Sequence, residues 1–277
     1  MTSLFVQRLT KVSYANRSLV CVGLDPDPKH MPVQDVLQFN RAIVDATHDL
    51  VCAYKPNLAF YEGLGMAGLK ALESTLAHIR TQAPQVVVIA DAKRGDIGNT
   101  SIAYARALFE VWGFDAATIS PYLGGDSLEP FLVYRDKGSF LLCRTSNAGA
   151  RDLQELVLKA NDEPLYVHVA RKAKEWNKNG NVCLVVGATA PDEMKRVRLI
   201  CADMPILIPG IGAQAGDLAA GVRNGVDANG RLAVINSSRG IIYASRGPDY
   251  ATAARRATES LRDAINKVLE QEGKGWS

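Results

Sequence analysis

The chain contains a short apolar run, Val86-Val87-Val88-Ile89-Ala90, which leads directly into Asp91-Ala92-Lys93-Arg94-Gly95-Asp96. An uninterrupted β-branched run is typical of a strand that is buried on both faces of a parallel sheet. Because side chains alternate along a strand, Asp91 and Lys93 are expected to leave its end on the same side. Charges at the tip of a core strand add little to stability, since desolvation offsets their pairing, whereas catalytic sites need such clusters.

Similar apolar runs recur along the chain. The eight candidate strands cover residues 19–23, 51–55, 86–90, 116–120, 139–143, 182–187, 206–209 and 232–236. Segments with helical periodicity separate them, and residues 250–271 are expected to form a closing helix. Strands that alternate with helices imply right-handed βαβ units and a parallel sheet. Eight such units predict an α/β fold, a (β/α)₈ TIM barrel, formed by residues 1–277 as a single domain.

The composition is that of an ordinary globular protein, with 47% hydrophobic and 22% charged residues. The net charge of +3 comes without a basic tract, so no nucleic-acid partner is expected. No apolar run approaches the ~20 residues that span a bilayer, and the start lacks the apolar segment of a secretory signal. The cysteines are odd in number and widely spaced, which indicates reduced, buried thiols in a cytoplasmic protein.

In a TIM barrel the active site lies at the C-terminal ends of the strands, where this sequence places polar and glycine-rich segments. Lys55 ends the second strand, and Asp91, Lys93 and Asp96 follow the third. Contacts of ~4 Å between such charges are each worth about 4 kcal/mol at an effective dielectric near 20. We therefore expect an alternating array of two cations and two anions. The alternative is a purely structural salt-bridge network at the barrel rim.

The loops after the seventh and eighth strands indicate a phosphate site. They read Gly210-Ile211-Gly212-Ala213-Gln214-Ala215-Gly216 and Asn236-Ser237-Ser238-Arg239-Gly240. Glycines allow backbone N–H groups to approach an anion, and Arg239 can make a bidentate contact, although glycines also serve as plain turn formers. The first loop matches the dinucleotide pattern G-x-G-x-x-A as well. No acidic residue ends the next strand to hold a ribose, which disfavours that interpretation.

Metal and nucleophile chemistry finds little support in the sequence. The histidines His30, His48, His78 and His168 are scattered, and none pairs with another ligand at metal spacing. No G-x-S-x-G elbow occurs, and no cysteine lies beside a histidine. We therefore predict no metal site.

These residues together resemble the orotidine 5′-monophosphate decarboxylase family, in its longer bacterial branch. The resemblance covers nearly the whole chain, from Gly23-Leu24-Asp25 to Ser238-Arg239-Gly240. Its most specific part is Asp91-Ala92-Lys93-Arg94-Gly95-Asp96-Ile97-Gly98-Asn99-Thr100. Further support comes from Tyr54-Lys55-Pro56-Asn57 and from Pro209-Gly210-Ile211-Gly212-Ala213-Gln214.

The resemblance implies decarboxylation of orotidine 5′-monophosphate to uridine 5′-monophosphate and carbon dioxide. It also implies a homodimer whose active sites lie at the interface, with no metal or organic cofactor. Lys93 would protonate C6 of the pyrimidine as the carboxylate leaves, and Asp91 would lie against that carboxylate. Lys55 would orient Asp91 and contact the ribose.

The resemblance assigns Asp96 to catalysis as well, and the remaining site residues to substrate binding. Asp25 would bind a ribose hydroxyl and Ser146 the pyrimidine, while Gln214 and Arg239 would hold the phosphate. The residues expected to reach into the partner's site are Asp96, Ile97 and Thr100. Two positions depart from the family pattern: Ala148 stands where proline is expected, and Ser238 where shorter members have glycine. These departures are expected to affect the binding loops.

Two other functions fit parts of the pattern. A sugar-phosphate lyase that resembles 3-keto-L-gulonate 6-phosphate decarboxylase would share the D-x-K-x-x-D strand. Such relatives hold Mg²⁺ and carry an acidic residue on the second strand, where Lys55 would repel the metal. A barrel that binds phosphorylated ligands without catalysis is the second alternative, but it would not need the charged array.

Overall fold

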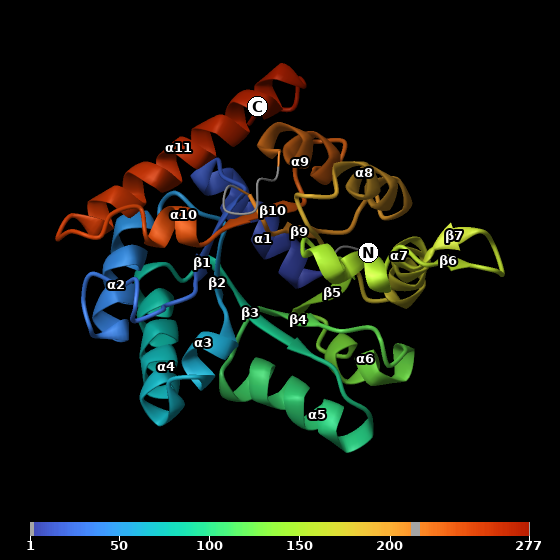
Figure 1. Cartoon of the computed structure of the whole chain (residues 1–277), viewed down its shortest axis with the longest axis horizontal. Helices are drawn as coiled ribbons and strands as arrows, with labels where there is room; N and C mark the ends of the chain where they lie inside the picture. The colour runs from blue at the N-terminus through green and yellow to red at the C-terminus, as the bar shows by residue number, and fades with distance from the viewer. Residues whose placement is uncertain (1–2, 212–216, 277) are drawn as a thin grey trace.

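Eight parallel strands form a closed barrel in this computed structural model, which describes residues 3–211 and 217–276 (Figure 1). Around the barrel they follow the order β1 (Val20–Leu24), β10 (Ala233–Ser237), β9 (Ile206–Ile208), β8 (Val182–Val186), β5 (Gly138–Arg144), β4 (Ala116–Ile119), β3 (Val87–Arg94) and β2 (Ala53–Pro56). All eight predicted strands and the predicted TIM barrel are thus confirmed. The closed sheet also excludes the dinucleotide-binding fold.

Helices surround the barrel and connect its strands (Figure 1). They are α2 (Val36–Thr47), α3 (Leu58–Glu62), α4 (Gly65–Gln82), α5 (Gly98–Arg106), α6 (Gly125–Leu132), α7 (Leu165–Trp176), α8 (Pro191–Ile200), α9 (Leu218–Gly225), α10 (Arg239–Ile242) and α11 (Tyr250–Gln271). The last has the bounds predicted for the closing helix. Short turns of π-helix, η1 (Ala107–Val111), and 3₁₀-helix, η2 (Ala148–Asp152), complete the connections together with a small hairpin, β6 (Val157–Leu158) and β7 (Glu163–Pro164).

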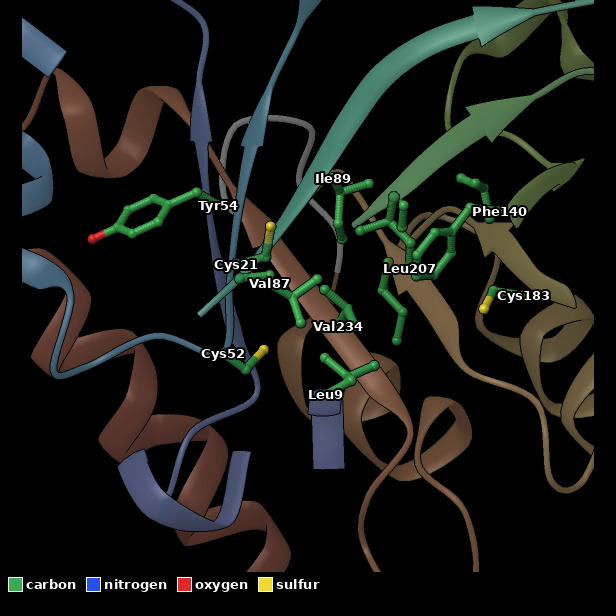
Figure 2. Packing of buried hydrophobic residues seen from close by; sticks show 14 of the residues in the cluster. Leu9, Cys21, Cys52, Tyr54, Val87, Ile89, Phe140, Cys183, Leu207 and Val234 are labelled. Atoms are coloured by element: carbon green, nitrogen blue, oxygen red, sulfur yellow. The ribbon is translucent and has the colours of Figure 1, made fainter. Parts of the chain in front are cut away.

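An N-terminal helix, α1 (Leu4–Asn16), lies against the N-terminal ends of the strands. The Ser3 side chain caps it by accepting a hydrogen bond from Val6 N. Phe5 packs edge-on against Phe140 with a centroid distance of 5.9 Å, and Arg8 pairs with Asp115, just before β4, at 2.6 Å. Figure 2 shows Leu9 of this helix beside the barrel core. The helix therefore covers the end of the barrel opposite to the expected site.

One packed hydrophobic cluster fills the barrel and the space between the strands and the helices. Its first member in the chain is Phe5 on α1, and its last is Leu269 on α11. All five cysteines are buried and free, as predicted: Cys21, Cys52, Cys143, Cys183 and Cys201. Three of them are visible in Figure 2. None of the helices within residues 3–211 and 217–276 is long and apolar enough to cross a membrane.

Strand β3 runs four residues beyond the predicted end at Ala90, so that boundary was wrong. Ala90 pairs with Ala117, but the next pair along the two strands joins Arg94 to Ile119. Three residues of β3, Asp91 to Lys93, therefore lie opposite a single residue of β4, which makes a β-bulge. At this bulge Lys93 has a φ of 45°, in the left-handed region that residues other than glycine seldom adopt.

Candidate active site

Two lysines hold one carboxylate at the C-terminal end of the barrel. Lys55 Nζ, on β2, lies 2.8 Å from Asp91 Oδ2, and Lys93 Nζ lies 2.5 Å from Asp91 Oδ1. The Lys55 and Asp91 side chains are only 4% and 10% exposed, whereas that of Lys93 is 52% exposed. The array thus offers one ammonium to the solvent side and keeps the other beneath it.

The charges in this cluster keep one another ionised. Burial alone would raise the pKa of Asp91, but Lys55 and Lys93 outweigh it and hold that pKa well below its usual range. Burial alone would lower the pKa of Lys55, but the carboxylates of Asp91 and Asp25 hold it above its ordinary value. At neutral pH, Asp91 is therefore an anion and Lys55 a cation.

Asp96 does not join this cluster within one chain, contrary to the predicted array of four. The chain turns after Arg94, and Asp96 Oδ1 accepts a hydrogen bond from its neighbour Ile97 N at 2.8 Å. Ile97 and Thr100 are exposed, Thr100 on the first turn of α5 and Ile97 just before it. The three residues assigned to the partner's site thus lie outside the cavity of their own barrel, and their role there stays a prediction.

A cavity of about 380 Å³ opens above the array, within the size range of small-molecule sites. It brings Lys55, Asp91, Lys93 and Ser146 together, and its remaining lining residues are Thr118, Leu142, Thr145, Asn147, Val185, Leu207 and Pro209. The polar groups thus meet an apolar wall that comes largely from β5, β8 and β9.

The loop that carries Ser146 is tied to the barrel at several points. Arg144, 5% exposed, pairs with Glu155 at 2.6 Å, and Thr145 N donates to Gln154 Oε1 at 2.8 Å. Ser146 O accepts from Thr189 Oγ1 at 3.2 Å. Ala148 begins the 3₁₀ turn η2 in this loop, and its effect on ligand binding stays a prediction.

Asp25 directly follows the end of β1. Its Oδ1 is buried and has no hydrogen-bond partner in the described part of the chain. A buried, unpaired oxygen is costly, which fits a site that a hydroxyl donor fills. Asp25 is not among the residues that line the cavity over Lys93. Its carboxylate acts on Lys55, whose pKa it helps to raise.

The predicted phosphate site is described only in part. Gln214 lies outside the described residues, as do Gly212, Ala213, Ala215 and Gly216. Arg239 begins α10 and is exposed, and its side chain has no hydrogen bond or ion pair within residues 3–211 and 217–276. A free guanidinium at this rim is available to an anion, but phosphate binding stays a prediction.

Sequence reasoning gave no individual role to two polar residues at this end of the barrel. Thr118, on β4, lines the cavity and is 1% exposed. Asn236, on β10, is 6% exposed with its Oδ1 unpaired in the part of the chain described. The available signal was a polar residue inside an otherwise apolar strand, since a buried polar side chain requires a partner.

The donor set of the site does not suit a metal ion. Both oxygens of Asp91 are already occupied by ammonium groups. Over the described ranges, no group of three or more His, Cys, Asp or Glu residues is placed to hold a metal.

Comparisons with known proteins identify the family of this chain. The family model described as "Orotidine 5'-phosphate decarboxylase / HUMPS family" matches residues 18–257. The chain belongs to this family. The predicted resemblance of the chain to the orotidine 5′-monophosphate decarboxylase family is therefore confirmed.

Individual members of the family match over nearly their whole length. The orotidine 5′-phosphate decarboxylase of Dehalococcoides mccartyi (strain BAV1) is 53% identical over 265 residues, which cover 95% of this chain and 97% of that protein. That of Cellvibrio japonicus is 49% identical over 271 residues, with 95% and 98% covered. Among solved structures, Leishmania donovani OMP decarboxylase has a TM-score of 0.82 at 41% identity and covers 96% of this chain and 99% of its own.

Proposed function

We propose that the chain decarboxylates orotidine 5′-monophosphate to uridine 5′-monophosphate and carbon dioxide, with neither a metal nor an organic cofactor. The observation that carries this proposal is the Lys55–Asp91–Lys93 array at the floor of the cavity. The relatives named as orotidine 5′-phosphate decarboxylases, about half identical to this chain, support the choice of substrate.

The array suits the charge movement of this reaction. When the bond between C6 and the carboxylate carbon breaks, its electron pair stays on C6, a ring carbon without an obvious electron sink. A fixed ammonium such as Lys93 stabilises the charge that develops there once the bound substrate displaces water from the cavity. Lys93 then gives its proton to C6, and carbon dioxide leaves.

Asp91 acts on the substrate rather than on the product. Its carboxylate stays ionised beside Lys55 and Lys93, so it disfavours the substrate's own carboxylate in the ground state. That repulsion ends as neutral carbon dioxide forms. Lys55 fixes Asp91 through the 2.8 Å contact and offers its remaining protons to the ribose.

Binding groups distant from C6 supply the free energy that holds the substrate against this repulsion. Asp25 accepts a ribose hydroxyl with its unpaired oxygen, and Ser146 bonds the pyrimidine. Gln214 and Arg239 hold the phosphate.

The same proposal includes a cytoplasmic homodimer in which residues 1–277 act as one domain. Asp96, Ile97 and Thr100 of each chain complete the partner's site. Large apolar side chains are exposed near the C-terminal end of the barrel, with exposed fractions of 58% for Ile97, 54% for Ile102 and 79% for Tyr122. Ile97 and Ile102 lie at the start and in the middle of α5, and exposed apolar side chains that share one helix support a protein interface.

A decarboxylation assay tests the proposal directly. We expect the purified chain to consume orotidine 5′-monophosphate, followed by its absorbance, at the same rate with and without EDTA. Lys93→Ala should lower kcat by at least about 100-fold, since general acid catalysis contributes that much. Its circular dichroism spectrum should stay native.

The matched control is Lys11→Ala, which removes an exposed lysine from α1, away from the site; its kcat should equal that of the wild type. Absence of turnover in the wild type would overturn the proposed substrate. Activity that depends on Mg²⁺ would instead favour the sugar-phosphate lyase mechanism. A near-normal kcat for Lys93→Ala would show that Lys93 is not the proton donor.

A further inference from the structure

One buried hydroxyl lies opposite the bulge that carries Asp91 and Lys93. Thr118, on the neighbouring strand β4, is the single residue that faces the three bulged residues of β3. Its Oγ1 accepts hydrogen bonds from Ala92 N at 3.1 Å and from Lys93 N at 3.0 Å. The same oxygen donates to Asp91 Oδ1 at 3.1 Å.

These three bonds use the full capacity of the hydroxyl. A threonine hydroxyl has one proton to donate and two lone pairs to accept with. The proton goes to Asp91, and the lone pairs take the two amides, so the group has no free position for water or substrate. Although Thr118 lines the cavity, its hydroxyl serves the cluster beneath the cavity rather than a ligand.

The bulge needs this support because its backbone departs from the regular ladder between β3 and β4. The regular pairing stops at Ala90 and resumes at Arg94, whose carbonyl accepts from Ser120 N at 2.8 Å. Between these points the backbone amides of Ala92 and Lys93 donate to the Thr118 hydroxyl instead of to a backbone carbonyl of β4. They do so where Lys93 adopts its left-handed φ of 45°.

We propose that Thr118 is a positioning residue that sets the backbone of Lys93 and the direction of the Asp91 carboxylate. Asp91 Oδ1 receives both the Thr118 hydroxyl and the Lys93 ammonium, so one oxygen links the bulge to the proton donor. This inference rests on the proposed decarboxylation, because Lys93 is the group whose placement it explains. Small displacements of a reacting group can cost about 100-fold in rate.

The test compares Thr118→Val, which keeps the shape and removes the hydroxyl, with Thr75→Val. Thr75 on α4 is also fully buried; its Oγ1 donates to Ala71 O at 2.7 Å and accepts from Asn40 Nδ2 at 3.1 Å. We expect Thr118→Val to lower kcat by about 10- to 100-fold. The Kd of uridine 5′-monophosphate, measured by calorimetry, should stay within about threefold, since product binding needs no proton transfer.

Calorimetry also counts the binding sites, and kcat is expressed per site. A lower kcat per site then reports a displaced Lys93 and not a smaller amount of folded protein. Thr118→Ser should restore kcat to within about threefold of the wild type, and Thr75→Val should leave it there. If Thr118→Val does not fold, Thr118→Cys replaces it, and its weakly bonding thiol should lower kcat by about 10-fold.

The inference is overturned if kcat per site in Thr118→Val, or in Thr118→Cys where that variant replaces it, equals the wild-type value. It is also overturned if Thr75→Val loses as much activity, or if Thr118→Ser recovers none. Inactive wild-type protein would overturn the proposed function itself. An active wild type with an equally active Thr118→Val would overturn only the role of Thr118.

Discussion

At the scale of single residues, Asp91 is the point on which the candidate site depends. Its two oxygens contact Lys55 and Lys93, and its side chain is only 10% exposed. Burying such an ion pair returns little net stability, but removing one partner leaves an uncompensated buried charge. The cluster is therefore explained better by chemistry at Lys93 than by stability of the barrel.

Asp91→Asn should destabilise the chain at neutral pH by about 3–5 kcal/mol, because Lys55 then stays buried without its anion. The folded-state pKa of Asp91 is lowered, so its contribution is fully present above the unfolded pKa of about 4 and is lost as the pH falls through the folded value. The gap in unfolding free energy between wild type and variant should thus shrink below about pH 4. Urea unfolding at a series of pH values measures it.

The control for this series is Asp136→Asn, which neutralises an exposed aspartate just before β5. Its unfolding free energy should stay within about 0.5 kcal/mol of the wild-type value at neutral pH. A gap for Asp91→Asn that stays constant down to the lowest pH would contradict the lowered pKa of Asp91.

At the scale of elements, β1 packs closely against the end of β10 because residue 23 is a glycine. A Cβ placed on Gly23 would lie 1.9 Å from Ser238 Oγ and 2.9 Å from Ser238 Cβ. Ser238 thus requires a glycine at position 23 of β1. The pair keeps the start of α10, where Arg239 lies, close to the end of β1.

Gly23→Ala should therefore lower the unfolding free energy by about 1–3 kcal/mol, as overpacked cores do. Ser238→Gly in the same chain should recover most of that loss, because the next nearest atom, Asn236 Oδ1, is 3.3 Å away. Gly221→Ala on α9 is the control, since its Cβ would meet Ile211 Cδ1 at an ordinary 3.5 Å. Urea unfolding measures these free energies. A double variant no more stable than Gly23→Ala would contradict the close contact between Gly23 and Ser238.

Elements built from a local pattern were predictable, and those built from tertiary hydrogen bonds were not. The eight strands follow from short apolar runs, which periodicity reveals. The extension of β3 to Arg94 depends on the Thr118 hydroxyl, which comes from a neighbouring strand. The position of Asp96 was predicted wrongly because it also depends on the backbone beyond the bulge, where Asp96 accepts a hydrogen bond from Ile97 N. The grouping of Lys55, Asp91 and Lys93 was predicted correctly because parallel strands end at one rim.

At the scale of the whole molecule, the two ends of the barrel differ. Helix α1 covers the N-terminal end, where Arg8 pairs with Asp115. Near the C-terminal end, Ile97 and Tyr122 expose more than half of their surface. Asp96 precedes α5 on this side, and its Oδ1 accepts a hydrogen bond from Ile97 N. The proposed homodimer predicts that Asp96 completes the active site of the partner subunit.

Mixing two inactive variants tests this sharing of sites. Lys93→Ala and Asp96→Ala should each be inactive alone. After subunit exchange, half of the dimers are mixed, and each mixed dimer has one intact site of two, so about 25% of wild-type activity should return. A mixture of Lys93→Ala with Lys93→Met is the control, because every site of every dimer then lacks the lysine. Turnover of orotidine 5′-monophosphate is measured before and after exchange. If Asp96 served its own barrel, the first mixture would stay as inactive as the control.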